Sequence, residues 1–260
     1  MTVLLGKPGS GKTTVAGTFP KPMLYVSIGS DGGGVVLSGM DDIDVVDLRS
    51  NEKTSVYMQM MSLIEELRTS KHKYKSVVID AYSSIEEDQV TFAERAKGKQ
   101  LSLDERGAIM NMMVRMRDAI VSLAEREQEE YVLICHIKNK EDVDNITGEK
   151  SMQIIPKMTY NNGNILLERA SNVMYCTRKP VKTEDGKTEV KFLTYIGPHP
   201  YIDTKLRTRG VPLPRGLYIE DCTYDKIEEL KSGTTVKQSI VVDVPESKNP
   251  FEEEKTEGEW

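Results

Sequence analysis

The chain has 260 residues, 38% of them hydrophobic and 29% charged, which is typical of a globular protein with one large α/β domain or two small ones. No apolar run reaches the roughly 18 residues that a membrane helix needs, and no N-terminal segment has the pattern of a secretion signal. The cysteines Cys135, Cys176 and Cys222 are too far apart for a zinc motif or a disulfide framework. We therefore expect a cytoplasmic protein in reducing surroundings, without a membrane partner.

The formal net charge of −6 is spread unevenly along the chain. Residues 169–216 hold ten basic and four acidic side chains, whereas residues 245–260 hold six glutamates and two lysines. The basic stretch is either an ordinary solvated surface or one that faces phosphate or nucleic acid. We expect the acidic end to be a disordered tail that solubilises the protein, docks on a partner protein or competes with DNA for the basic surface.

Short apolar runs predict buried strands, and apolar residues at helical spacing between them predict helices. The strands are expected at residues 2–5, 23–28, 43–48, 75–80 and 131–135, and the helices at residues 54–69 and 102–127. The second helix opens with Ser102 and Glu105 at capping-box spacing. Its methionines are expected to fill the core rather than to bind a cofactor. This alternation is typical of a wound, mostly parallel α/β sheet.

After residue 136 the composition becomes more polar, and residues 137–165 predict a long loop. Strands are expected again at residues 173–177 and 190–196, joined by a turn at residues 184–187. We expect one domain over residues 1–231, followed by a linker and tail over residues 232–260.

The strongest motif is Gly6-Lys7-Pro8-Gly9-Ser10-Gly11-Lys12-Thr13, which matches G-x-x-x-x-G-K-[ST] between a predicted strand and a predicted helix. Glycines let backbone N–H groups turn inward around phosphate oxygens. Lys12 would then reach the β- and γ-phosphates, and the Thr13 hydroxyl would bind Mg²⁺. The expected nucleotide-binding residues are Gly6, Pro8, Gly9, Ser10, Gly11, Lys12, Thr13 and Thr14.

An acid ends the fourth predicted strand, where Asp80 would hold Mg²⁺ together with Thr13. Hydrolysis also needs a group that orients water, and the candidates are Asp31, Glu86 and Glu87. Asp31 could equally be a turn residue before two glycines. His136, which ends the fifth strand, either senses the γ-phosphate or is an ordinary hydrogen-bonded histidine.

These blocks, in this order, resemble the RecA-type ATPase core and, more narrowly, phage-encoded nucleotide-binding proteins of the single-strand annealing kind. The resemblance covers roughly residues 1–225 and is carried by residues 6–14, 19–26, 80–84, 133–136, 155–157, 172–175 and 205–207. It implies a P-loop NTPase core with a mostly parallel twisted sheet flanked by helices and a C-terminal β-hairpin region. It also implies that Lys12, Thr13 and Asp80 bind ATP and Mg²⁺.

The resemblance further implies roles for residues that the P-loop motif does not contain. Asp31 would activate water, His136 would be the polar sensor, and Lys205 and Arg207 would enter the site of a neighbouring subunit in a ring or filament. Loops within residues 81–107 and 137–165 would face single-stranded DNA, with Tyr160 as a stacking residue. The implied function is phage recombination or annealing, with a single-strand-binding or recombination protein as partner.

Two other functions remain open from the sequence. A P-loop small-molecule kinase would share the phosphate turn, although no compact arginine-rich lid is evident in the sequence. A non-enzymatic DNA-binding module that uses ATP as a switch would also share it. Independently of these alternatives, Lys205 and Arg207 could be part of an ordinary basic β-turn surface.

Overall fold

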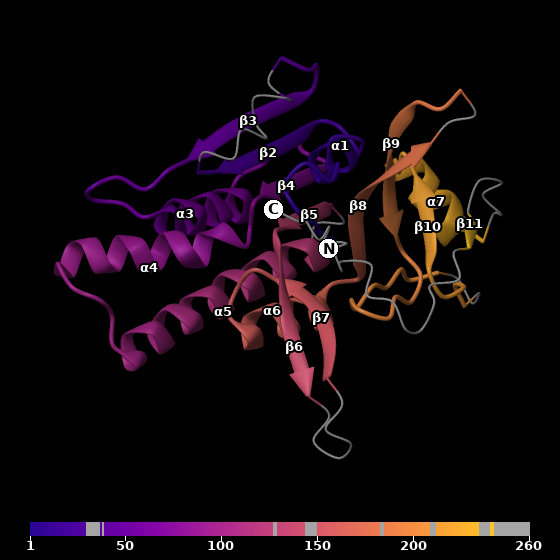
Figure 1. The fold of residues 1–260 in the computed structure, drawn as a ribbon. Coiled ribbons are helices and arrows are strands. Elements are labelled where there is room, and N and C mark those ends of the chain that lie inside the picture. Colours follow the sequence, from indigo (N-terminus) through magenta and orange to yellow (C-terminus); the bar gives the residue numbers. More distant parts are fainter. Residues whose placement is uncertain are drawn as a thin grey trace.

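The computed structural model describes residues 1–29, 37, 39–126, 129–143, 150–182, 185–208, 212–233 and 240–241. Asp31 and the acidic tail, both singled out in the sequence, lie outside these residues. Nine strands of the described chain form one sheet in the order β11-β10-β9-β8-β1-β5-β4-β2-β3 (Figure 1).

The central part of this sheet is parallel. Its strands are β1 (Thr2–Leu5), β2 (Met23–Ile28), β3 (Ile43–Leu48), β4 (Ser76–Asp80), β5 (Glu130–Cys135) and β8 (Asn172–Lys182). The first five are the expected strands, within one residue at their ends. β1, β2 and β4 are buried along their whole length, which explains their continuous apolar runs.

The sheet continues beyond β8 as antiparallel strands. β9 (Thr188–Tyr195) pairs with β8, β10 (Leu217–Glu220) pairs with β9, and β11 (Ile240–Val241) pairs with β10. The expected C-terminal hairpin is therefore confirmed, with longer strands than the sequence indicated. The predicted fold class, an α/β sheet that is mostly parallel and flanked by helices, is confirmed as well.

Helices cover the sheet on both faces. One core packs β1, β2, β4 and β5 against α3 (Val56–Thr69), α4 (Ser84–Lys97), α5 (Leu103–Arg126) and α6 (Tyr160–Arg169). The other core packs the opposite face against α1 (Lys12–Ala16) and α7 (Tyr224–Lys231). Two of the expected methionines, Met113 and Met116, are buried in the first core, as predicted.

The capping box at the start of α5 is also confirmed. The backbone N–H of Ser102 donates to Glu105 at 2.8 Å, and the N–H of Glu105 donates back to the Ser102 hydroxyl at 3.4 Å. These bonds satisfy donors that the first turn of a helix leaves without partners.

The predicted loop over residues 137–165 is wrong. The segment forms a two-stranded antiparallel arm, β6 (Ile137–Val143) and β7 (Lys150–Pro156), followed by the start of α6. Figure 1 shows the arm projecting from the body of the molecule. An arm with little core to face needs few apolar residues, so β6 lacks the alternation by which strands are recognised in a sequence.

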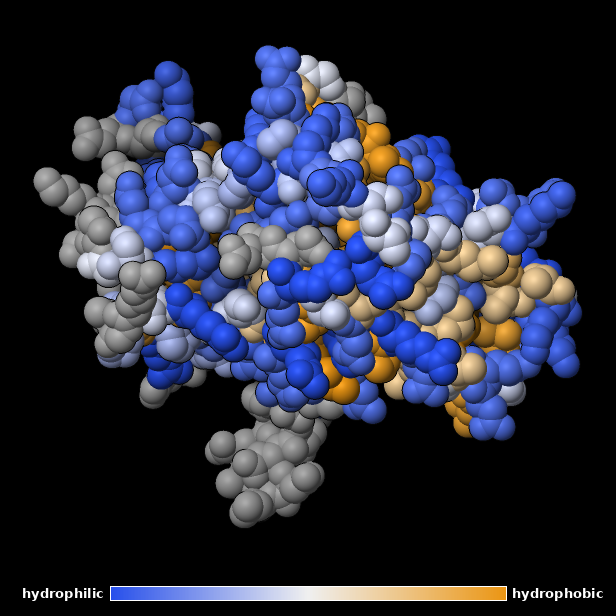
Figure 2. Space-filling model, turned by 180° about the vertical axis from the view of Figure 1, so that it is seen from behind, coloured by the Kyte–Doolittle hydropathy of each residue, from blue (hydrophilic) through white to orange (hydrophobic). Residues whose placement is uncertain are grey.

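The far face of the molecule is mainly hydrophilic, and apolar residues gather toward the side formed by α4 and α5 (Figure 2). Among the described residues, no helix has both the length and the apolar character required to cross a membrane.

Candidate functional site

The glycine-rich turn between β1 and α1 lies at the carboxyl edge of the parallel strands. Gly9 and Gly11 have φ angles of 72° and 86°, a left-handed conformation that side chains other than glycine rarely adopt. Gly6 is constrained by space instead, because a Cβ there would collide with the Cys176 carbonyl oxygen and the Ser10 hydroxyl. The turn is therefore shaped by its three glycines, and α1, with five residues, adds only one short turn of helix.

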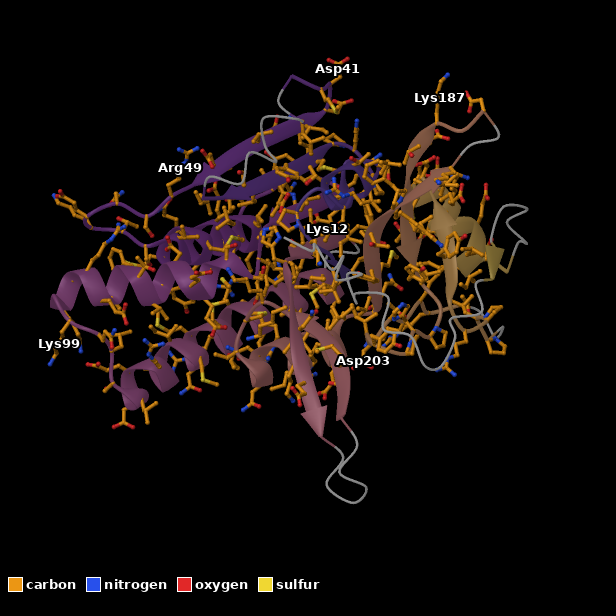
Figure 3. The ribbon with its side chains drawn as sticks, in the orientation of Figure 1. Lys12, Asp41, Arg49, Lys99, Lys187 and Asp203 are labelled. Carbon is orange, nitrogen blue, oxygen red and sulfur yellow. The ribbon has the colours of Figure 1, made fainter. Side chains whose placement is uncertain are left out.

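Lys12 lies across this turn. Its side chain is buried, and its ammonium group donates to the carbonyl oxygens of Gly6 at 3.0 Å and Lys7 at 2.8 Å. Figure 3 shows Lys12 near the middle of the molecule. An ammonium group attracts an anionic oxygen more strongly than a neutral carbonyl oxygen, because both partners then carry a full charge. A phosphate inside the turn would therefore be a better partner for this ammonium than the two carbonyls.

Thr13 and Asp80 come together across the sheet, as the sequence predicts. The Thr13 hydroxyl donates to Oδ2 of Asp80 at 2.9 Å. β1 and β4 are parallel and separated only by β5, so their carboxyl ends meet at one edge. The same Asp80 oxygen accepts the hydroxyl of Tyr25, a fully buried residue of β2. Sequence reasoning missed Tyr25, because a tyrosine in a buried strand carries no signal of its own.

The end of β5 supports the turn from the other side. The N–H of Gly6 donates to the Cys135 carbonyl at 3.3 Å, and the N–H of His136 donates to the Ser83 hydroxyl at 2.9 Å. Burial raises the pKa of the Cys135 thiol to about 12, which keeps it uncharged. His136 thus lies where a strand-end sensor was expected, next to the residue that holds Gly6.

The β8–β9 hairpin lies on the opposite side of the turn from Asp80. A Cβ placed on Gly9 would lie 3.7 Å from a guanidinium nitrogen of Arg178, an exposed residue of β8. A Cβ on Gly11 would lie 3.1 Å from the Phe192 ring of β9. Neither residue belongs to a sequence motif, although both lie in the basic segment 169–216, for which a phosphate-facing surface was one interpretation.

This geometry fits a magnesium–nucleotide complex. Ser10 is buried in the turn, and its hydroxyl has no hydrogen-bond partner among the described residues. Buried polar groups are normally hydrogen-bonded, so such an atom indicates a missing partner. A phosphate oxygen would supply it, while Thr13 and Asp80 offer the oxygen ligands that Mg²⁺ prefers.

Comparison with known families identifies the type of domain. The sequence model of a family described as an AAA domain matches residues 1–208. The chain belongs to this AAA domain family. Membership implies that the P-loop domain binds or hydrolyses nucleotide. The match does not support the narrower resemblance to phage annealing proteins, and no curated protein matches the chain.

Two acids of the AAA domain that the sequence offered as water-orienting residues have other partners. Glu86 is buried and accepts from the N–H and hydroxyl of Thr159 and from the Asn162 amide, at 3.2–3.4 Å. It thereby joins α4 to the start of α6. Glu87 is exposed and pairs with Lys157 at 3.1 Å. Asp31, the third candidate, lies outside the described residues.

Lys205 and Arg207 lie away from the glycine-rich turn. Lys205 forms a β-bridge with Val173, which is in register with Val3, and the N–H of Arg207 donates to Asn172 at 3.4 Å. Both contacts lie toward the amino ends of β1 and β8. In Figure 3, the nearby Asp203 is well separated from Lys12. The Lys205 ammonium donates to the Glu168 carbonyl at 3.0 Å, and burial, with the Arg207 charge, lowers its pKa.

Proposed function

We propose that this AAA domain binds ATP with Mg²⁺ and hydrolyses it. The observation that carries the proposal is the convergence of Lys12, Thr13 and Asp80 at one edge of the sheet, with Thr13 and Asp80 already 2.9 Å apart. These three residues combine a phosphate-binding turn with two oxygen ligands for a metal ion. Either feature alone would be a much weaker indication of nucleotide hydrolysis.

Each residue of the site would have its own role in ATP hydrolysis. The turn's N–H groups and Ser10 hold the phosphates, Lys12 neutralises charge on the β- and γ-phosphates, and Thr13 and Asp80 hold the metal. Bound Mg²⁺ would supply charge neutralisation at the β- and γ-oxygens. Asp31 remains our proposal for the residue that orients water, since Glu86 and Glu87 are engaged elsewhere. His136 would respond to the γ-phosphate from the end of β5.

Lys12→Ala tests this proposal. We expect ATP turnover to fall by roughly 100-fold or more, because the variant removes a cation aimed at charge that develops in the transition state. Lys99→Ala is the matched control, since Lys99 is an exposed lysine at the far end of the molecule (Figure 3). Phosphate release with and without Mg²⁺ measures the effect. Unchanged turnover in Lys12→Ala would refute the assignment.

Phosphoryl transfer to a small molecule is a second candidate, and one cavity favours it. A hollow of about 380 Å³ lies at the carboxyl ends of β2 and β3 beside the start of α4, on the Asp80 side of the turn. Arg49, Arg95 and Asp88 line it together with the strand-end Gly29. A hydrolase would release ADP and free phosphate from ATP alone, whereas a kinase would form ADP quickly only with an acceptor present and would transfer the phosphoryl group to that acceptor instead of releasing it.

We further propose that the protein acts on single-stranded DNA, in recombination or annealing. The basic segment 169–216, with a net charge of +6, supports this, as does the β6–β7 arm that leaves the sheet directly after His136. ATP hydrolysis measured with and without single-stranded DNA tests it. We expect stimulation by DNA, and binding whose log K falls by about 0.7 per phosphate contact for each tenfold rise in salt. No binding at low salt would contradict this role.

An oligomer would give Lys205 and Arg207 a function that their own subunit does not offer. We propose that they reach the γ-phosphate of a neighbouring subunit, where such a cation is worth roughly 1,000-fold in rate. Arg207→Ala and Asp80→Ala subunits would each be inactive, and mixing them should restore part of the activity. Failure to restore it in intact oligomers would contradict the inter-subunit role.

A further inference from the structure

A cavity of about 220 Å³ adjoins the phosphate turn on the side of the β8–β9 hairpin. Its walls come from the turn and α1, from β9, and from the segment that joins β10 to α7. The lining residues are Ser10, Gly11, Thr14, Val15, Thr18, Phe192, Thr194, Asp221, Cys222 and Thr223.

The position of the cavity matches where the nucleoside end of a bound nucleotide would leave the turn. β1 lies between β4 on one side and β8 and β9 on the other (Figure 1). Asp80 ends β4, whereas Phe192 and Thr194 of β9 line the cavity. Mg²⁺ held by Thr13 and Asp80 would neutralise charge on the β- and γ-phosphates, so Asp80 would mark the terminal-phosphate end of a bound nucleotide. The other end of the ligand then points away from β4, past Thr14 and into the cavity.

The walls of the cavity suit an uncharged planar group better than another phosphate. Val15 and Cys222 are buried, and burial raises the pKa of the Cys222 thiol to about 12, so that wall carries no charge. Asp221 is exposed at the rim, where its carboxylate would repel an anion. An apolar pocket with a few polar groups is typical of sites for aromatic ligands.

Phe192 supplies an aromatic surface over this cavity. Its side chain is 40% exposed, which is unusual for so large an apolar residue in the described chain, and its ring lies against Gly11. β9 alternates its side chains, so Phe192 shares its face with Thr194, which also lines the cavity. The ring can therefore stack on a base whose phosphates occupy the turn.

We propose that this cavity holds the base of the bound nucleotide and that Phe192 stacks on it. The inference rests on the proposed nucleotide binding and adds a base-recognition site to it. Part of that site lies outside the matched family region, which ends at residue 208. The later segment is fixed to the P-loop helix region, since the N–H of Tyr224 donates to the Thr18 hydroxyl at 2.8 Å and its ring contacts Phe19 at 4.9 Å.

Binding of ATP and of inorganic tripolyphosphate to Phe192→Ala tests the proposal. Loss of base stacking should weaken ATP binding by about 5- to 150-fold and leave tripolyphosphate binding unchanged. Val190→Ala is the matched control, because Val190 is 49% exposed on the same face of β9 but does not line the cavity. It should bind both ligands as the wild type does.

Two results would overturn the inference while nucleotide binding stands. Phe192→Ala could bind ATP as tightly as Val190→Ala, or it could lose ATP and tripolyphosphate equally, which would show that the ring only supports the turn. A wild-type protein that binds neither ligand would refute the proposed function itself, and this inference with it.

A second measurement does not depend on weakened binding. Trp260 is the single tryptophan of the chain, so Phe192→Trp in a Trp260→Phe background places one fluorophore at the cavity. ATP should change its emission, whereas tripolyphosphate should not. An equal response to both ligands, or none to ATP at saturation, would contradict stacking.

Discussion

The two flanks of the phosphate turn are built differently. On the β4 flank, Asp80 is 7% exposed and accepts hydrogen bonds from Thr13 and the fully buried Tyr25. On the β8–β9 flank, Arg178 is exposed and Phe192 is 40% exposed. The β4 flank is therefore a largely buried cluster of hydrogen-bonded polar side chains, whereas the β8–β9 flank has exposed side chains beside a cavity.

The difference follows from the cost of burying charge. A buried carboxylate needs hydrogen-bond partners in the folded protein, so the flank that we propose for the metal must be organised before any ligand arrives. Exposed groups carry no such requirement and can adjust to a ligand. We therefore expect the β4 flank to set the chemistry and the β8–β9 flank to set affinity and selectivity.

The largest expected effect is that of Asp80→Asn. The variant keeps the shape of the side chain and removes the charge that would hold Mg²⁺, so turnover should fall by roughly 100- to 1,000-fold. ATP binding in the presence of a chelator should change little, because the phosphate turn itself is unaltered. A turnover within tenfold of the wild type would show that the β4 flank does not hold the metal.

Arg178→Ala should have a smaller effect, and unlike Phe192→Ala it should weaken the binding of both ligands. A hydrogen bond to a charged group contributes about 1.5–3 kcal/mol, so ATP and tripolyphosphate should both bind roughly tenfold or more weakly. Lys179→Ala is the control, because Lys179 is the next residue of β8 and is also exposed. Equal losses in the two variants would indicate a general charge effect rather than a contact at the turn.

The sequence indicated Thr13 and Asp80 of the β4 flank, although not Tyr25, because these two residues belong to fixed local patterns. The phosphate turn is a contiguous motif, and Asp80 ends a strand whose apolar run is unmistakable. Parallel strands bring their carboxyl ends to one edge, so the meeting of Thr13 and Asp80 follows from the fold class alone.

The β8–β9 flank could not be predicted in the same way. Arg178 and Phe192 reach the turn only because β8 pairs with β1 and then extends past it with β9. That placement depends on the length and register of strands, and apolar spacing in the sequence gives neither. The β6–β7 arm was missed for a related reason, since its strands pair with each other outside the main sheet.

Acid should lower the stability of the folded protein through His199, which packs against β8 and β9. Burial, together with the charge of Arg215, lowers the pKa of His199 to about 4, and its ring contacts Tyr175, Tyr195 and Tyr201. His199 takes up a proton near pH 6.5 in the unfolded chain but only near pH 4 in the folded protein. As the pH falls between these values, protonation therefore favours the unfolded chain, and the free energy of unfolding decreases. Allowing for partial exposure, we expect a loss of roughly 1–2 kcal/mol.

His199→Phe isolates this contribution, because the ring is kept and the titration is removed. Urea denaturation at several pH values should give a flatter dependence between pH 6.5 and pH 4 in the variant than in the wild type. Parallel curves would show that His199 titrates alike in the folded and unfolded chains.

Tyr25→Phe should have the smallest effect on stability and turnover. It tests directly whether the Tyr25 hydroxyl holds Asp80 in place on the β4 flank. It removes one hydrogen bond to Asp80 and keeps the ring that packs in the core, so the free energy of unfolding should fall by about 1 kcal/mol. If the flank is organised in advance by this bond, the Mg²⁺ concentration needed for half-maximal turnover should also rise. Loss of stability without that rise would mean that Thr13 alone positions the carboxylate, and that Tyr25 belongs to the core rather than to the site.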